Sequence, residues 1–478
     1  MYRDEIGHNT VIYMVKTLMN VIFPLITFKY ASNVILASGI GASNFSSAVI
    51  SYVGLISSLG ISSYAISEGS KIRRDREQLS NFVSEVFTIN IVSMTLSYCV
   101  LFLLLIFVGR LASYSYLILI YSTTILFNAL GIEWYFTIDE KFDYITKRSI
   151  LFQIISLALL FVLVRNENDV YWYVALTAMS SAGSGILNFI YSKRTIKIRI
   201  AALSNCKKHL RPILIIWAAN VASLIYVNAD TIIIGLMNGD AAVGYYSAAV
   251  KVVKAICMPI GAISVVAGPQ LAESISDNNQ EKINQISKRV MEFMSFFMFP
   301  CFVGLLCLGK ESILLISGDE FLPGLTAERI LLFDIFLSPL NSFIANQVMI
   351  PIKKEKTSMI AMIIAASANI ILDFFLIGVI GIDGAALATV ISEALVFVIC
   401  LKCVLNTVDI KIIIRNVWKY AFSSLLILPV HILCKRLTDS SLILTIRTVL
   451  LSVISYCIMV CILTKQNPIK KIQRFRNK

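Results

Sequence analysis

The sequence predicts an all-α, polytopic membrane protein with about 14 transmembrane helices, and three observations carry this prediction. Of its 478 residues, 57% are hydrophobic and only 15% are charged, which is too apolar for a soluble enzyme. Apolar stretches of about 20 residues, long enough to cross a hydrocarbon core of roughly 30 Å, recur from end to end. Lys and Arg gather in short runs, and between neighbouring runs there is nearly always room for two apolar stretches and one turn with few cations.

The predicted spans follow one another regularly along the chain. They lie at 10–30, 43–66, 81–108, 112–137, 150–164, 170–191, 212–236, 241–269, 290–316, 327–350, 358–380, 383–401, 417–434 and 442–463. Because the count is even, both termini lie on one side of the membrane. Most of the 42 Lys and Arg fall in the chain ends and in every second loop. The positive-inside rule therefore predicts that both termini and the basic loops are cytoplasmic.

An internal repeat indicates how the spans are grouped. Residues 32–49 and 229–250 both read as an apolar helix that ends in a Gly-rich turn, followed by small residues and an aromatic residue. Gly-rich turns can also look alike by chance, but transporters are often built from repeated halves. A duplication of six helices predicts one lobe at 1–205 and a second at 206–410, with two further helices and a basic cytoplasmic tail at 411–478.

The composition argues against several other function classes. The net charge of +13 comes from cations spread over every predicted inner loop, which argues against nucleic-acid binding. The ten Cys lie mostly inside spans, where they are expected to be small apolar fillers, and the three His lie far apart, so we expect no metal site and no cofactor. The outer turns carry no catalytic motif, which predicts that the chain is not an enzyme. The tail at 465–478 is expected to be a solvated topology anchor, with anionic membrane lipids as its alternative partner.

The four cations of the first and eighth predicted spans are candidate substrate-binding residues. Lys16 and Lys29 fall in the first span, and Lys251 and Lys254 fall in the eighth. A charge near mid-bilayer costs roughly 2.5–3.5 kcal/mol, so each needs a partner or a wet cavity. Lys251 and Lys254 share one helix face, which suggests an anion or water between them. For Lys16 and Lys29 the alternative is snorkelling to the two interfaces.

Acids and tyrosines complete the candidate site. The acids that we expect to be buried are Glu68, Glu133, Asp230, Asp334, Asp373 and Glu393. Asp230 is the best single candidate for ion coupling, with an N-cap or helix-end hydrogen bond as the alternative. Asp373 and Glu393 lie in neighbouring helices and are candidates for the same role or for neutralising a lysine. Tyr245 and Tyr246 are candidates for contact with sugars.

Several segments in order along the chain resemble one known family. These are residues 67–85, 132–149, 187–191, 243–250 and 381–389. They resemble the polysaccharide-unit flippases, the Wzx-like branch of the multidrug/oligosaccharidyl-lipid/polysaccharide (MOP) superfamily. The resemblance implies two six-helix lobes that form a V around a central cavity, plus two C-terminal helices, and transport by alternating access.

The function expected from this resemblance is a flippase of the bacterial cell membrane. It would move a polyprenyl-pyrophosphate-linked oligosaccharide repeat unit from the cytoplasmic to the outer leaflet, for a surface polysaccharide such as O-antigen or capsule. A polysaccharide polymerase and glycosyltransferases would be its partners. The alternatives are an ion-coupled multidrug exporter or a lipid II flippase of the same superfamily, or a membrane enzyme such as a polymerase. Intramembrane lysines favour an anionic cargo over cationic drugs, and a polymerase would need a large external catalytic loop.

Overall fold

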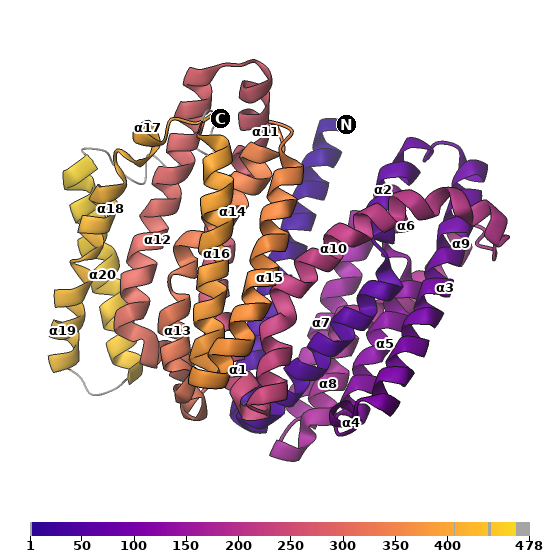
Figure 1. Cartoon of the computed structure of the whole chain (residues 1–478), viewed down its shortest axis with the longest axis horizontal. Coiled ribbons are helices and arrows are strands. Elements are labelled where there is room, and N and C mark those ends of the chain that lie inside the picture. The colour runs from indigo at the N-terminus through magenta and orange to yellow at the C-terminus, as the bar shows by residue number, and fades with distance from the viewer. Residues whose placement is uncertain (1, 406, 438–440, 465–478) are drawn as a thin grey trace. The chain divides into compact units, whose positions relative to one another are not determined.

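The computed structural model describes residues 2–405, 407–437 and 441–464, except for the side chains of 2–18, 21, 219, 222, 223, 225, 226 and 441. All regular structure in these residues is helical, so the all-α prediction is confirmed. The chain divides into two compact units, Met1–Gly244 and Tyr245–Lys478 (Figure 1). The predicted boundaries at 205/206 and 410/411 are not tested by this division and stay predictions.

The N-terminal unit is built from long helices joined by short turns. Its elements are α1 (Tyr2–Ser58), α2 (Ile61–Lys71), α3 (Arg76–Phe107), α4 (Gly109–Ala112), α5 (Ser115–Gly131), α6 (Glu133–Ile138), α7 (Phe142–Leu163), η1 (Glu167–Asp169), α8 (Val170–Ala178), η2 (Met179–Gly183), α9 (Ser184–Thr195) and α10 (Leu203–Met237). Asp75 caps α3 by accepting hydrogen bonds from the backbone N–H groups of Glu77 and Gln78. This cap fixes the start of α3 at Arg76, five residues after α2 ends at Lys71.

Helix α10 packs within the N-terminal unit rather than starting the second one. It contacts α1, α2 and α3, and the Trp217 indole N–H donates to the Leu55 carbonyl at 2.9 Å. These contacts explain why the compact units divide after α10. The predicted lobe boundary at 205/206 refers to the repeat in the sequence and stays a prediction.

The two copies of the repeat contact one another through glycines. A Cβ atom added to Gly41 would lie 1.7 Å from the Asp240 carbonyl oxygen, and one added to Gly244 would lie 2.2 Å from that of Ala37. Only glycine permits this approach of backbone to backbone. The first copy does not turn at its glycines, because α1 continues through them. The helix is instead broken at Leu36, which has φ +60°.

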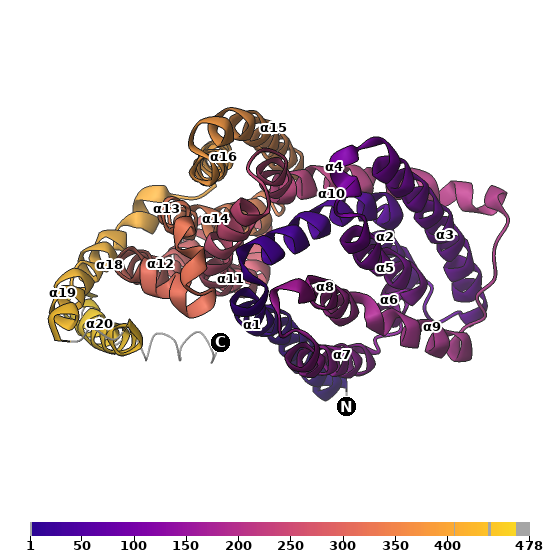
Figure 2. The ribbon, with the colours of Figure 1, turned by 90° about the horizontal axis from the view of Figure 1, so that it is seen from below.

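The C-terminal unit contains the remaining spans. Its elements are most of α11 (Asp240–Ser276), α12 (Gln280–Ile316), η3 (Asp319–Gly324), α13 (Leu325–Leu331), α14 (Asp334–Ser342), η4 (Phe343–Met349), α15 (Glu355–Ile380), α16 (Ile382–Val404), α17 (Ile410–Ile414), α18 (Val417–Ser424), α19 (Ile427–Leu437) and α20 (Ser441–Thr464). Helices α15 and α16 form a close pair (Figure 2). The last helices pack on α12, where the Tyr456 hydroxyl donates to the Phe296 carbonyl at 2.9 Å.

The helices are long and apolar enough for a multi-pass membrane protein. Ten described helical segments meet the length and composition needed to cross a membrane, and two shorter apolar helices lie at Ser115–Gly131 and Val227–Met237. Residues 22–71 form one of these ten segments, although the sequence predicts two spans in this region. A straight helix as long as α1 would measure about 85 Å, far more than a bilayer core of roughly 30 Å. The break at Leu36 divides it, and fourteen spans stay a prediction.

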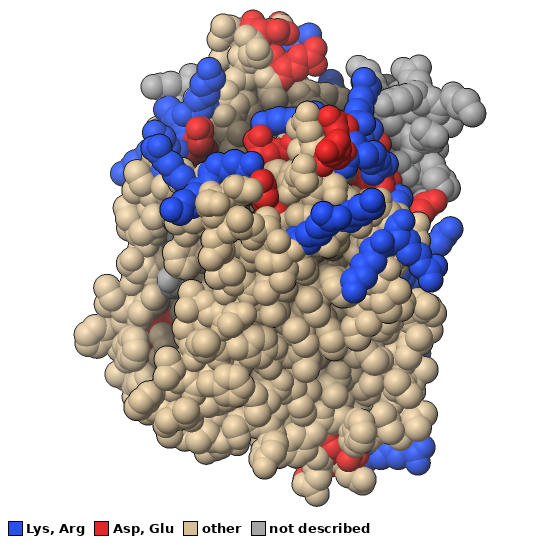
Figure 3. Space-filling view, turned by 90° about the vertical axis from the view of Figure 1, so that its right-hand side faces the viewer, with Lys and Arg blue, Asp and Glu red and all other residues tan. Residues whose placement is uncertain are grey.

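Loops that the sequence predicts on one side lie at one end of each unit. In the N-terminal unit, Asp139 pairs with both Arg76 and Lys141 at 2.9 Å, which joins two predicted inner loops. In the C-terminal unit, Gln280 donates to the Thr407 carbonyl at 2.8 Å and joins two more. Figure 3 shows Lys and Arg gathered at one end of the face it displays, beside a broad band almost free of charged side chains.

Candidate cargo-binding and ion-coupling site

Helix α11 presents two lysines within an apolar span. Lys251 and Lys254 are three residues apart and share a face of the helix, where Lys251 is partly buried. The Lys254 ammonium lies 2.8 Å from Oδ2 of Asp334, whose side chain is only 1% exposed, whereas 43% of the Lys254 side chain is exposed. The ion pair therefore orients Lys254, and much of the Lys254 side chain stays exposed. Because an ammonium has three N–H donors, it can bind an anion as well.

Asp334 belongs to a larger polar cluster inside the C-terminal unit. It begins α14, and Asn341 follows two turns later on the same helix. The Asn341 amide donates to Oε2 of Glu393 at 2.6 Å and to the Glu393 carbonyl at 2.9 Å. Glu393, on α16, is close enough to act electrostatically on Lys254. The predicted residues Lys254 and Glu393 thus lie in one cluster, which offsets the cost of burying charge.

Helix α15 carries a second buried polar pair. Asp373 is 0% exposed and Asn369, one turn earlier on the same face, is 1% exposed. Neither polar atom of the Asn369 amide has a hydrogen-bond partner among the described residues. A fully buried carboxylate needs positive charge or strong hydrogen-bond donors nearby. Carboxylate and amide oxygens are ligands that suit a hard cation or a proton, so this pair fits the predicted coupling role of Asp373.

Asp230 lies within a helix and not at its end. Its side chain is 6% exposed, and α10 continues for about two further turns to Met237. The helix-end hydrogen bond, which the sequence left open as an alternative, therefore does not describe this residue. Asp230 belongs to the N-terminal unit, whereas Asp373 and Glu393 belong to the other.

The remaining candidates lie in different surroundings. Tyr246 is 4% exposed and its hydroxyl lies 3.1 Å from Oγ1 of Thr389. Tyr246 is therefore placed as a packing residue. Tyr245 is partly buried and meets the Phe321 ring edge-on. Lys29 is exposed on α1. Lys16 lies within α1, but its side chain falls outside the described residues, as does the tail at 465–478.

Two of the acids that the sequence predicted to be buried are not buried. The Glu68 side chain is 41% exposed and pairs with Lys71, and that of Glu133 is 48% exposed and pairs with Arg148. Both acids lie near the charged end of the unit, where a neighbouring cation is available. The prediction of burial was wrong for these two because it considered only the apolar sequence around each acid, whereas both acids lie at the exposed end of the unit. In the described part of the chain, no group of three or more His, Cys, Asp or Glu is placed to hold a metal.

Sequence reasoning gave no role to Asp334, Asn341 or Asn369. Asp334 stood out only as an acid in an apolar stretch, and the two asparagines did not stand out at all. The spacing of Asp334 and Asn341, and that of Asn369 and Asp373, places each pair on one helix face, which was a usable signal. Which lysine Asp334 would meet depends on packing between helices about 80 residues apart.

Comparison with known proteins gives the family. A family model described as "Polysaccharide biosynthesis protein" matches residues 6–275, more than half of the chain. The chain belongs to this family. Its relatives include the "Putative O-antigen transporter" of Escherichia coli (strain K12), which is 22% identical over 403 residues, or 81% of this chain and 94% of that protein. The "Probable low-salt glycan biosynthesis flippase Agl15" of Haloferax volcanii is 25% identical over 193 residues, or 40% of this chain and 41% of that protein.

Solved structures show the fold of this polysaccharide biosynthesis protein. "Lipid II flippase MurJ, inward closed conformation" matches with a TM-score of 0.77 at 19% identity, over 95% of this chain and 99% of that one. An inward-facing MATE transporter of the MOP superfamily matches with a TM-score of 0.61 at 15% identity, over 83% and 97%. The family match supports the resemblance seen in the sequence, and the fold is the one that these two solved transporters share.

Proposed function

We propose that this protein flips a polyprenyl-pyrophosphate-linked oligosaccharide repeat unit from the cytoplasmic to the outer leaflet of a bacterial cell membrane, for surface polysaccharide biosynthesis. The family match and the names of the two relatives support a cargo used in glycan biosynthesis. The family arrangement of two six-helix lobes around a central cavity would let the sugars cross by alternating access. Glycosyltransferases would act before this step, and a polymerase would act after it.

The lysine pair of α11 is the observation that carries the proposal. A pyrophosphate brings about two to three negative charges into a medium that solvates them poorly, so fixed cations must offset its desolvation. Lys251 and Lys254 lie on one face of an apolar helix, and Asp334 orients Lys254, whose side chain stays partly exposed. A site for cationic drugs would need the opposite charge, which is why the lysines favour the phosphate-bearing cargo over a multidrug exporter.

The energy source is proposed to be an ion gradient. The chain carries no ATP-binding motif. Asp230, Asp373 and Glu393 are buried acids in membrane helices, the kind of residue that marks proton or cation pathways. Among them Asp373 is the strongest candidate, since it is 0% exposed and has the Asn369 amide on the same helix face. Glu393 already accepts hydrogen bonds from Asn341, so its proposed part is to balance the charge of Lys254.

Deletion of the gene in its host tests the proposed function. We expect surface polysaccharide to be lost and the lipid-linked repeat unit to accumulate on the cytoplasmic side, because synthesis continues while translocation stops. Mass spectrometry of extracted lipids and polysaccharide electrophoresis measure the two effects. Unchanged polysaccharide with raised sensitivity to cationic drugs would instead support the multidrug exporter, and loss of peptidoglycan precursor export would support the lipid II flippase.

The proposed orientation has its own test. In a cysteine-free background, Lys207→Cys, at the exposed start of α10, should react with a membrane-impermeant maleimide only after the cells are opened. Glu167→Cys, in the exposed turn η1, should react in intact cells. The physical reason is the positive-inside rule, which places the basic loops and both termini in the cytoplasm. Labelling of Lys207→Cys from outside would refute this orientation.

A further inference from the structure

A cavity of about 1080 Å³ lies at the charged end of the N-terminal unit. The walls come from the start of α3, the turn before α7 and the extended segment 196–202 that leads to α10. Its lining combines four cations with hydroxyl, amide and carboxylate groups. The cavity lies among predicted cytoplasmic loops and is formed within one unit, so it is separate from the lysines of α11.

The extended segment 196–202 is held firmly against α3. Three hydroxyl groups on one face of that helix, spaced four residues apart, each bond to its backbone. The bonds join Ser80 Oγ to the Lys197 carbonyl (2.6 Å), the Arg199 N–H to Ser84 Oγ (3.1 Å) and the Ala201 N–H to Thr88 Oγ1 (2.8 Å). A backbone fixed in this way holds its side chains in place before any ligand arrives, which lowers the entropic cost of binding.

Alternation along this segment directs its cations to the cavity. Ile196 is buried and Ile198 packs against the same core cluster, whereas Lys197 and Arg199 are exposed and line the cavity. Successive side chains of an extended segment point to opposite sides, so anchoring the isoleucines turns both cations the other way. Neither cation forms an ion pair with an acid in the part of the chain that the structure describes.

Most of the acids in the lining are already neutralised. Asp139 is shared by Arg76 and Lys141, each at 2.9 Å. Burial by itself lowers the pKa of Lys141, but the bond to Asp139 raises it above its ordinary value, so this amine stays charged. Two cations on one carboxylate leave an excess of positive charge at this wall.

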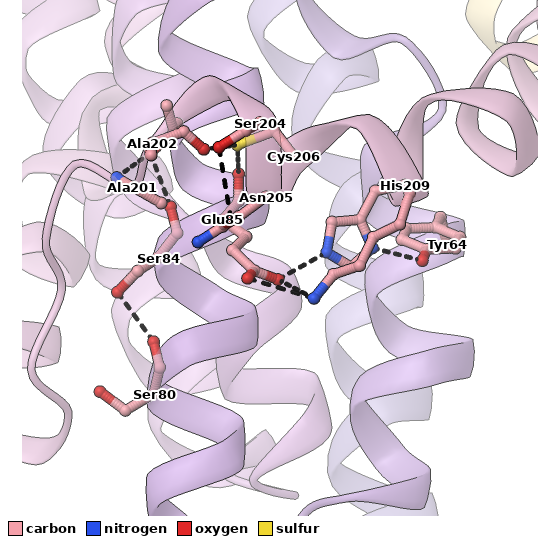
Figure 4. Close-up of polar contacts among 12 residues, drawn as sticks. Tyr64, Ser80, Ser84, Glu85, Ala201, Ala202, Ser204, Asn205, Cys206 and His209 are labelled. Atoms are coloured by element: carbon pink, nitrogen blue, oxygen red, sulfur yellow. Dashed lines mark hydrogen bonds and ion pairs between the residues drawn. The ribbon is translucent and has the colours of Figure 1, made fainter.

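Glu85 is neutralised from the other side by the start of α10. The carboxylate accepts from Lys208 at 2.9 Å and lies 2.8 Å from the buried His209 ring, whose second nitrogen lies 2.7 Å from the Tyr64 hydroxyl (Figure 4). Glu77 is then the only acid of the lining for which the described structure shows no cation partner. The surplus charge of the cavity is therefore positive and is centred on Lys197 and Arg199.

We propose that this cavity is a cytoplasmic binding site for a phosphoryl anion that carries neighbouring hydroxyl groups. Lys197 and Arg199 are its phosphate ligands, and the amides of Asn81 and Asn205 are placed to bind hydroxyls. The volume suits a sugar phosphate group. The anion belongs either to the head group of the cargo, an identification that rests on the proposed function, or to an anionic membrane lipid.

Binding to the purified full-length protein in detergent tests this site. The probes are inorganic pyrophosphate by calorimetry and, in nanodiscs, phosphatidylglycerol against neutral phosphatidylcholine. The variant is Lys197→Gln with Arg199→Gln. Its matched control is Lys193→Gln with Arg194→Gln, which removes the same charge from the exposed end of α9 just before the segment, outside the lining. We expect affinity for pyrophosphate to fall about tenfold or more in the variant and less than about twofold in the control.

The two sources of the anion give different results. Pyrophosphate binding that needs Lys197 and Arg199 assigns the site to a soluble phosphoryl group, as in the cargo head group. Enrichment of phosphatidylglycerol that needs the same two residues, without pyrophosphate binding, assigns it to lipid. Equal losses in variant and control, or binding of neither probe, overturn the proposal. These assays measure binding and not transport, so an absence of binding would reject this site and leave the proposed function intact, which the gene deletion tests separately.

Discussion

Replacing Lys251 and Lys254 together by alanine should abolish surface polysaccharide while the protein stays in the membrane at near-normal abundance. Each hydrogen bond to a charged group contributes about 1.5–3 kcal/mol, so loss of two contacts to pyrophosphate should slow translocation at least about a hundredfold. Arginine at both positions should restore part of the activity, because the requirement is for charge. Polysaccharide electrophoresis and membrane immunoblots measure export and abundance.

The matched control removes the same charge elsewhere. Lys282→Ala with Lys356→Ala changes two exposed cations of predicted inner loops and should export normally. If the double-alanine variant is lost from the membrane, adding Asp334→Asn should restore its abundance. The reason is that Lys254→Ala leaves the buried Asp334 carboxylate without its ion-pair partner. Breaking a buried pair from one side costs about 3–5 kcal/mol, whereas removing both charges costs less.

A neutral-pair variant, Lys254→Gln with Asp334→Asn, separates two roles for Lys254. If the lysine serves only to neutralise Asp334, this variant should export normally. If it binds the cargo, that double variant should be abundant and inactive, which is the result we expect. Normal export by either the double-alanine or the neutral-pair variant would contradict the assignment of Lys254 to the cargo site.

Asp373→Asn should remove the dependence of transport on an ion gradient. The side chain is 0% exposed, so asparagine keeps its shape while removing the charge that a bound proton or cation would balance. We expect the translocation rate in vesicles with an imposed pH or sodium gradient to fall about tenfold or more, to the rate seen without a gradient. Asp230→Asn should act in the same direction, since Asp230 is also buried within a membrane helix.

Glu355→Gln is the control for this prediction. It removes a carboxylate from the same helix α15, at the exposed first residue, and should leave the gradient dependence unchanged. Wild-type rates and an unchanged gradient dependence in both Asp373→Asn and Asp230→Asn would rule out a coupling role for these acids. A loss of rate with the gradient dependence intact would show that they support the fold or the cargo site instead.

Most of the fold could be predicted because it is written in local patterns. Apolar stretches and the alternation of basic loops follow from the demands of a bilayer, and each predicted span is covered by helix in the described structure. The break in α1 could not be predicted, because it falls at Leu36 and not at the glycines that follow. Gly41 serves a different purpose there, since it allows contact with the backbone of Asp240.

The site was predicted less completely because its contacts join distant segments. Lys254 and Glu393 could be chosen singly as charges in apolar stretches. Their link through Asp334 and Asn341 depends on how α11, α14 and α16 pack. His209 was set aside as an isolated histidine, yet it lies between Glu85 and Tyr64, more than 120 residues earlier in the chain. A single sequence shows that each charge in an apolar stretch needs a partner, but it does not show which residue that partner is.

Reconstituted vesicles offer the most direct measurement of the central claim. The purified protein is placed in liposomes that contain a polyprenyl-pyrophosphate-linked oligosaccharide from the host, and exposure of the sugar is followed with a membrane-impermeant glycosidase. We predict protein-dependent movement of this lipid across the bilayer, lost in Lys251→Ala with Lys254→Ala and kept in Lys282→Ala with Lys356→Ala. Movement of lipid II or of a cationic drug, with none of the polyprenyl-linked oligosaccharide, would contradict the account.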